Sequence, residues 1–224
     1  MQRFTAPVPV PSAARRLLDS LPAAERPALW LADRWAATAA VRSSGYAALD
    51  AELPGGGWPR AGLTELLAVA PGCGEWRLLA PLLSSAGPQV GSVLCVAPPL
   101  TPYAPALQAL SLALPRLLVV QPDRLADAAW AAEQGLRSGA CEAVLWWLAP
   151  AAAADGALAP TAPDAASGAH PRSGPRPHKA SAAAVTTALR RLHLASLDAA
   201  CPLFALRSAT AQRQSSPAPL RLLL

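Results

Sequence analysis

The stretch LTELLAVAPGCGEWRLLAPLLSSAG, residues 63–87, contains the pattern on which the fold assignment depends. It begins with an apolar run, Leu63 to Ala70, that is typical of a buried strand. The tight turn PGCGEW follows, and an apolar helix pattern begins at Arg77. A strand, a glycine-containing turn and a helix in this order form the start of a βαβ unit.

The same alternation of strands and helices continues toward the C-terminal end. Strands that alternate with helices of ten to fifteen residues indicate parallel βαβ units, so we predict a three-layer α/β domain. The further predicted strands are residues 90–97, 116–121, 143–148, 202–207 and 220–224, and the predicted helices are residues 77–87, 103–114, 125–139 and 181–200.

Two segments depart from this alternation. Residues 1–42 read as an N-terminal helical arm, with Ser12 as a helix cap and Trp35 on an apolar stripe. Residues 43–224 form the predicted core. Within the core, residues 150–180 contain few large apolar side chains, so little burial offsets the entropy of ordering them. We therefore expect a disordered insertion there.

Composition limits the class of protein. The 224 residues, 53% of them hydrophobic, fit one domain with a short arm. Residues 78–115 carry no charge, but seven prolines interrupt them, so they do not form a membrane helix. The start of the chain lacks the apolar run of a secretory signal, and a cytoplasmic location without membrane contact is expected. The four cysteines form no C-x-x-C pair, which predicts buried free thiols and no metal site.

The turn after the first core strand is placed where a P-loop binds phosphates, but its residues do not suit that chemistry. Phosphoryl transfer needs a lysine, a hydroxyl for magnesium and an acidic residue at the end of a nearby strand. The only lysine is Lys179, in the predicted insertion, and the candidate Walker B strand carries Trp146 and Trp147. The chain is therefore predicted to have no cofactor and no enzymatic activity. The degenerate P-loop consists of Ala70, Pro71, Gly72, Cys73, Gly74, Glu75 and Trp76.

The basic side chains suggest two interaction sites. The net charge is +5, and about five positive charges net lie in residues 151–224. Arg172, Arg176 and Lys179 either follow a phosphate backbone or are simply solvated. A second candidate, for a protein partner, lies in the predicted helix 181–200, where the alternative is an ordinary helix with a polar face. It consists of Leu189, Arg190, Arg191 and Leu192.

The segment SSGYAALDAELPGGGWPRAGLTELL, residues 43–67, resembles the opening of the RecA-like core, and the match covers most of residues 43–207. In detail the chain resembles the ImuA family of RecA-like accessory proteins more closely. Members of that family are encoded together with ImuB, a relative of Y-family polymerases, and with an error-prone replicative-type polymerase. The sequence segments that carry this likeness are LPGGGWPRAGLTELL, APPLTPYAPAL, AAEQGLRSGA and SPAPLRLLL.

The resemblance places four catalytic positions on unsuitable residues. Glu75 stands at the position of the P-loop lysine, and Trp76 stands at the neighbouring hydroxyl position. The catalytic glutamate falls near Pro98 and the Walker B aspartate on Trp147. The resemblance therefore implies a RecA scaffold used for binding. By position alone, residues 150–180 and 208–219 correspond to the two DNA-binding loops of RecA.

The function that the resemblance implies is that of a non-catalytic adaptor in translesion DNA synthesis during the SOS response. Its expected partners are the ImuB-type subunit, RecA and the error-prone polymerase, with weak DNA contact. Two alternatives remain open: a RecA-type DNA-dependent ATPase with a divergent P-loop, and a cell-division inhibitor of the SulA kind. Two alternatives also remain open for Trp76. It either fills the vacated nucleotide pocket or is a partly exposed helix residue.

Overall fold

The computed structural model describes residues 40–84, 91–148 and 181–224. The chain divides into two compact units, one ending at Pro59 and one running from Arg60 to Leu224. The predicted boundary after residue 42 differs from this one, because β1 (Val41–Arg42) pairs antiparallel with β2 (Trp58–Pro59) inside the first unit. The rest of the predicted arm, residues 1–39, and the predicted insertion, residues 150–180, lie outside the described residues.

The described part of the first unit is a short helix between two short strands. Helix α3 (Ala47–Glu52) is tied to the preceding turn by Asp50, which accepts hydrogen bonds from Ser43 Oγ at 2.6 Å and from the Ser44 N–H at 2.8 Å. These bonds lower the pKa of the Asp50 carboxyl. Gly57 is required by close approach, because a Cβ there would lie 2.3 Å from the Arg42 carbonyl oxygen.

The second unit is built on a six-stranded sheet in which all neighbouring strands are parallel. The order across the sheet is β5-β4-β6-β7-β3-β8. The strands are β3 (Gly62–Ala68), β4 (Ser92–Val96), β5 (Leu117–Val120), β6 (Cys141–Leu148), β7 (Pro202–Ser208) and β8 (Leu220–Leu223). The helices are α4 (Glu75–Leu83), α5 (Ala104–Ala109), α6 (Leu125–Arg137) and α7 (Ala182–Asp198), and two 3₁₀ helices are η2 (Leu114–Arg116) and η3 (Ala209–Arg213).

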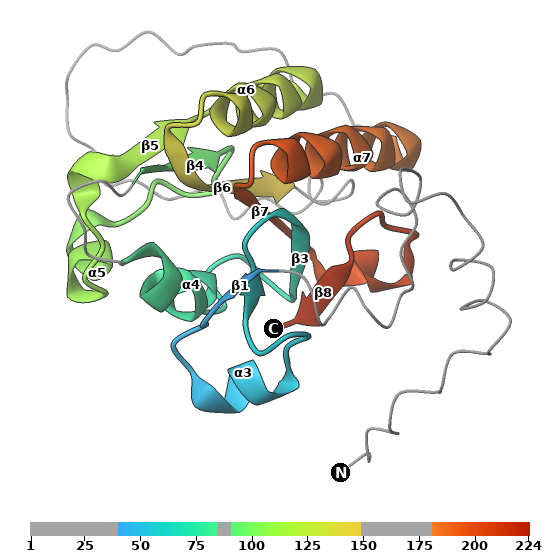
Figure 1. Ribbon diagram of the computed structural model, residues 1–224. Coiled ribbons are helices and arrows are strands. Elements are labelled where there is room, and N and C mark those ends of the chain that lie inside the picture. Colours follow the sequence, from blue (N-terminus) through green and yellow to red (C-terminus); the bar gives the residue numbers. More distant parts are fainter. Residues whose placement is uncertain (1–39, 85–90, 149–180) are drawn as a thin grey trace, which may run out of the picture. The chain divides into compact units, whose positions relative to one another are not determined.

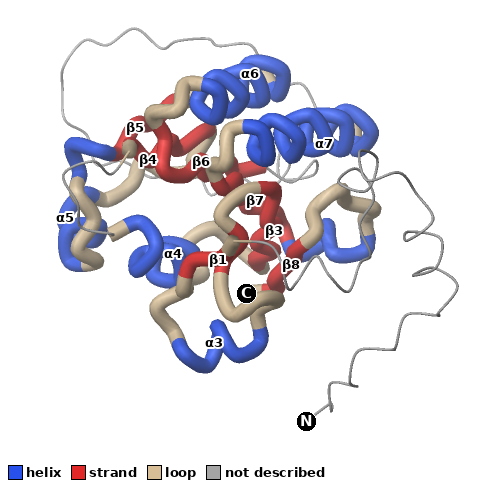
Figure 2. The backbone as a smooth tube through the Cα atoms, in the orientation of Figure 1, coloured by secondary structure: helices blue, strands red, loops and turns tan. Residues whose placement is uncertain are grey.

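Helices lie on both sides of this sheet. Helices α6 and α7 lie side by side over one face, whereas α4 and α5 lie toward the other (Figure 1; Figure 2). Parallel strands need crossover connections, and these helices provide them. The predicted α/β class with a parallel, layered sheet is confirmed at this level.

Some predicted element boundaries differ from the observed ones. Strand β3 ends two residues earlier than expected, at Ala68, and α4 begins two residues earlier, at Glu75. The helix expected over residues 103–114 ends at Ala109, because Ser111 adopts a left-handed conformation with φ of 62°. The Leu112 N–H then bonds back to the Leu107 carbonyl at 3.0 Å and closes the turn.

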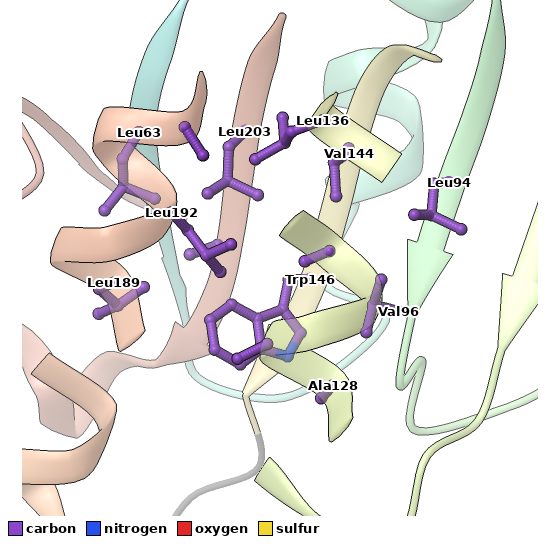
Figure 3. Close-up of a cluster of buried hydrophobic side chains, with 14 of the residues drawn as sticks. Leu63, Leu94, Val96, Ala128, Leu136, Val144, Trp146, Leu189, Leu192 and Leu203 are labelled. Carbon is purple, nitrogen blue, oxygen red and sulfur yellow. The ribbon is translucent and has the colours of Figure 1, made fainter. Parts of the chain in front are cut away.

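A hydrophobic cluster fills the space between the sheet and the pair α6 and α7. Small residues of α6, among them Ala128 and Ala132, allow that helix to approach the strands closely, and Trp146 of β6 lies in the middle of the cluster (Figure 3). Leu189 and Leu192 of α7 complete the cluster and are 0% exposed. Burial of this apolar surface contributes to the stability of the second unit.

The two adjacent tryptophans of β6 face opposite sides of the sheet, as the alternation of a strand requires. Trp146 is 1% exposed and packs in the cluster under α6 and α7, whereas Trp147 contacts the ring of Trp76 in α4. The prediction that these two residues form core on both faces is therefore confirmed.

We predict that Trp146→Ala lowers the free energy of unfolding by about 3–5 kcal/mol, because it leaves a cavity in a close-packed core. The matched control is Trp130→Ala: Trp130 is 61% exposed on α6, and its loss should change stability by no more than about 0.5 kcal/mol. Urea unfolding of both variants checks this. Equal costs for the two substitutions would show that the cluster under α6 and α7 is not the main core.

Candidate functional site

The candidate site lies at the carboxyl end of β3. In open α/β sheets, ligands bind outside the carboxyl ends of the strands. The loop after β3 runs from Val69 to Gly74 and leads directly into α4, and every residue in it is exposed. The predicted degenerate P-loop is thus a loop between a central strand and a helix N-terminus.

Within this loop the backbone turns through two left-handed glycines. Gly72 has φ of 84° and Gly74 has φ of 104°, and Gly74 is the N-cap of α4 without a side-chain cap. Glu75, the first helical residue, instead folds back onto the loop, where its Oε1 accepts a hydrogen bond from the Gly72 N–H at 2.8 Å. A carboxylate at this position is also favoured by the helix dipole.

The carboxyl group of Glu75 is buried although the loop around it is exposed. Glu75 is 4% exposed, and its second oxygen, Oε2, has no hydrogen-bond partner among the described residues. A buried carboxylate oxygen without a partner is costly, since it loses its hydration without compensation. This oxygen is therefore the unusual feature of the site.

Trp76 connects α4 to the end of β6. Its ring centroid lies 5.5 Å from that of Trp147, with an interplanar angle of 37°, and the residue is partly buried. Offset aromatic pairs of this kind add about 0.5–1.5 kcal/mol beyond the area that they bury. Of the two predictions for Trp76, that of a partly exposed helix residue agrees with its intermediate burial. The contact joins two positions that the resemblance assigns to catalysis.

The loop thus combines backbone N–H donors with a fixed negative charge. Glu75 repels phosphate groups where a P-loop lysine would attract them. Lys179, the single lysine of the sequence, lies outside the described residues. The described part of the loop therefore carries an acidic side chain, Glu75, and no lysine.

The structure divides the predicted partner-binding group. Leu189 and Leu192 are fully buried in the core, so the prediction that they contact a partner needs correction: their face of α7 packs on the sheet. Arg190 is exposed, and Arg191 is exposed enough to reach α6, where its Nε lies 3.1 Å from Glu133 Oε2. The apolar side chains that α7 does expose are Leu194 and Leu197, at 61% and 44%.

Several other predictions concern residues outside the described ranges, and others can be compared directly with the described part of the chain. Arg172, Arg176 and Lys179, the predicted DNA contacts, are in the range that the structure does not describe. Over the described ranges, no group of three His, Cys, Asp or Glu side chains is placed to hold a metal ion. No helix in the described part of the chain is long and apolar enough to cross a membrane.

The cysteines are free, but not all are buried as predicted. Cys95 and Cys201 are buried, which raises the pKa of each thiol to about 12. Cys73 is exposed because it lies at the tip of the loop after β3, between the two left-handed glycines.

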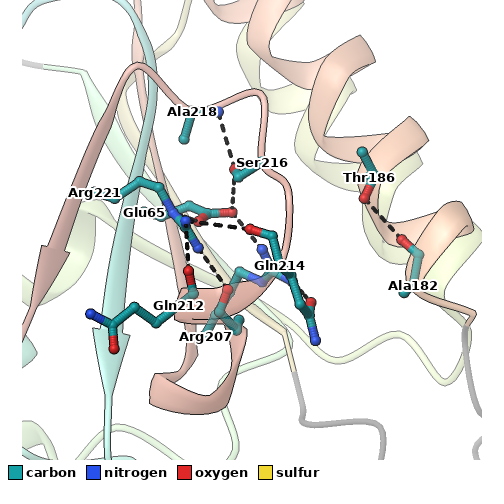
Figure 4. Close-up of polar contacts among 10 residues, drawn as sticks. Glu65, Ala182, Thr186, Arg207, Gln212, Gln214, Ser216, Ala218 and Arg221 are labelled. Atoms are coloured by element: carbon teal, nitrogen blue, oxygen red, sulfur yellow. Dashed lines mark hydrogen bonds and ion pairs between the residues drawn. The ribbon is translucent and has the colours of Figure 1, made fainter.

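Sequence reasoning missed a buried charge cluster on β3. Glu65 is 0% exposed and lies in the middle of the strand (Figure 4). Its Oε1 is 2.6 Å from Arg207 Nη1 of β7, and its Oε2 is 2.7 Å from Arg221 Nε of β8. Ser216 Oγ donates a further hydrogen bond to Glu65 Oε1 at 2.8 Å. One carboxylate thereby joins three neighbouring strands.

The same arginines hold the segment between β7 and β8. Arg221 donates to the carbonyl oxygens of Ala211, Gln212 and Gln214, and Arg207 Nη2 donates to Gln214 Oε1 at 2.8 Å. The sequence signal for this cluster was a single acid inside the apolar run after Gly62 and an arginine inside each of the last two strands. The pairing of those strands, which joins the three residues, became known only from the sheet order.

Two side chains of α7 fasten the beginning of β3. His193 Nδ1 accepts a hydrogen bond from the Leu63 N–H at 3.1 Å, and Ser196 Oγ accepts one from the Gly62 N–H at 2.8 Å. Burial lowers the pKa of His193, which favours the neutral ring that can accept this bond. Both residues therefore have structural roles.

Comparison with known proteins adds little. No family model matches the chain, and no curated protein matches it. Among solved structures it is similar to SulA from Pseudomonas aeruginosa, with 21% identity, a TM-score of 0.40, and coverage of 65% of this chain and 97% of that one. A likeness at this level carries no argument about fold or function.

We predict that Glu65→Ala lowers the free energy of unfolding by about 3–5 kcal/mol, because it leaves two guanidinium groups without their buried counter-ion. Glu133→Ala is the matched control. Glu133 also pairs with two arginines, Arg137 and Arg191, but those side chains are 67% and 53% exposed, so its loss should cost about 1 kcal/mol or less. Urea unfolding measures both values, and a similar small cost for the two variants would contradict the prediction.

Proposed function

We propose that this chain is a cytoplasmic, non-catalytic adaptor with a RecA-like core, acting in translesion DNA synthesis during the SOS response. Its direct partner is the ImuB-type subunit, with RecA and the error-prone polymerase as further partners. DNA contact is weak and involves Arg172, Arg176 and Lys179. The support is the sequence resemblance to the ImuA family together with the geometry of the loop after β3.

One observation carries the non-catalytic part of the proposal. The position that the resemblance assigns to the P-loop lysine holds Glu75, and its carboxylate accepts the N–H of Gly72 inside the loop. In a phosphate-binding loop, backbone N–H groups and a helix N-terminus bind the anion. Here an internal carboxylate uses one such donor and adds negative charge, while Trp76 and Trp147 stand at the magnesium-binding positions. The scaffold therefore supports binding of proteins better than phosphoryl transfer.

The proposed ImuB surface lies on the exposed side of α7. Because Leu189 and Leu192 are core residues, the apolar anchors of this surface are Leu194 and Leu197. Arg190 and Arg191 add positive charge beside them, which increases the encounter rate with an acidic partner. Arginine is one of the residue types that most often dominate the binding energy of an interface.

We predict that Arg190→Glu with Arg191→Glu weakens binding of the C-terminal tail of the ImuB-type protein at least about tenfold, or 1.4 kcal/mol, because charge reversal repels an acidic partner. The matched control is Arg124→Glu with Arg213→Glu, two exposed basic side chains on other parts of the second unit. Calorimetric titration of the purified tail into each variant measures the affinity, and urea unfolding verifies that all variants are folded.

The charge reversal at Arg190 and Arg191 should also lower damage-induced mutagenesis in cells that carry it. If the α7 reversal leaves both the complex and mutagenesis intact, while deletion of residues 1–42 abolishes them, the binding surface is the N-terminal segment and the assignment to α7 is wrong. If neither change affects the complex, the binding surface lies elsewhere on the chain, and if the tail does not bind the wild-type chain at all, the ImuB-type protein is not the partner.

A further inference from the structure

The starting observation is the unpaired oxygen of Glu75. The carboxyl group is held inside the loop because Oε1 accepts the Gly72 N–H at 2.8 Å. Its other oxygen, Oε2, is buried and has no hydrogen-bond partner among the described residues, in a side chain that is 4% exposed. A single N–H donor leaves most of the hydrogen-bonding capacity of a carboxylate unused.

Two other glutamates of the described chain, the buried Glu65 and the half-buried Glu142, differ in this respect. Glu65 is paired with Arg207 and Arg221. Glu142 is paired with Arg116, which also donates to the Gly91 carbonyl oxygen. In both cases the chain places a guanidinium group against the carboxylate, whereas at Glu75 no ion pair is formed within the described residues.

Two tryptophans lie at the same end of the sheet as Glu75. Trp76 follows it in α4, and the Trp76 and Trp147 rings form a pair at the same end of the sheet. A guanidinium group can donate two hydrogen bonds to a carboxylate and stack on an indole face, which an ammonium ion does less well. A Cβ on Gly72 or Gly74 of the exposed loop Val69–Gly74 would meet no atom within 4 Å, so there is open space beside these two positions.

We propose that the loop after β3 is a cation site that receives an arginine side chain of a protein partner, with Glu75 as the counter-ion and Trp76 and Trp147 as the aromatic wall. An ATP-binding relative would hold phosphate at this position, so the charge of the preferred ligand is opposite to that of phosphate. The inference goes beyond the proposed adaptor function, because it concerns a second surface, separate from Arg190 and Arg191 on α7.

The test is calorimetric titration of L-argininamide into the full chain at low ionic strength, with L-citrullinamide as the neutral isostere. The expected result is single-site binding of argininamide with a Kd of about 1 mM, as one ion pair with one stacking contact allows. Citrullinamide should bind at least about tenfold more weakly, because its urea group carries no charge.

Two variants locate the site. Glu75→Gln keeps an acceptor for the Gly72 N–H but removes the charge, and it should weaken argininamide binding at least about tenfold. Glu52→Gln, which removes an exposed carboxylate in α3, should leave the binding unchanged. Indole N–H resonances of Trp76 and Trp147, assigned by single Trp→Phe variants, should shift on titration of the wild type and not of Glu75→Gln.

The proposal is overturned if argininamide shows no saturable binding, if citrullinamide binds equally well, or if Glu75→Gln binds as the wild type does. The comparison of the two ligands on the wild-type chain decides the question even if Glu75→Gln does not fold. Neither outcome bears on binding of the ImuB-type tail, which is measured separately, so failure of this site and failure of the adaptor function are distinguishable.

Discussion

The buried carboxylate of Glu65 is the interaction on which the arrangement of the second unit depends. It lies in β3, which pairs with β7 on one side and β8 on the other, and its two arginines come from those two strands. Removing either partner of such a buried group is far more costly than removing a surface ion pair, so the charge cluster enforces the register of the three strands. Through Arg221 it also orders the segment around Gln212 and Gln214. The loop that carries Glu75 begins at the end of this same strand.

The two buried glutamates on either side of that loop differ in how their carboxylates are paired. Glu65 is neutralised within the fold and has a structural role, whereas Glu75 accepts one backbone N–H and keeps one unpaired oxygen. A chain selected only for stability would gain by replacing such a group with an apolar side chain. Residues that break a local rule in this way are expected at functional sites. This contrast is the reason that we place a binding site at the loop and none at the Glu65 cluster.

The α/β class and most elements could be predicted from the sequence, because apolar runs and helical spacing are local signals. The opposite orientations of Trp146 and Trp147 followed from strand alternation alone. Three features could not be predicted in this way. The inner face of α7 contains Leu189 and Leu192, and the spacing of apolar residues did not distinguish core from interface. The Glu65 cluster depends on pairing between distant strands. The hydrogen bond from Gly72 to Glu75 depends on the left-handed conformation of the loop.

We propose that the loop after β3 does not bind nucleotides, although it connects a strand to a helix as a P-loop does. The most direct test of this proposal is calorimetric titration of MgATP into the full-length chain under conditions in which the protein is folded. We expect no binding tighter than about 1 mM, because Glu75 uses a backbone donor of the loop and repels phosphate. Saturable binding with a micromolar Kd would contradict it and would make the divergent ATPase the better explanation.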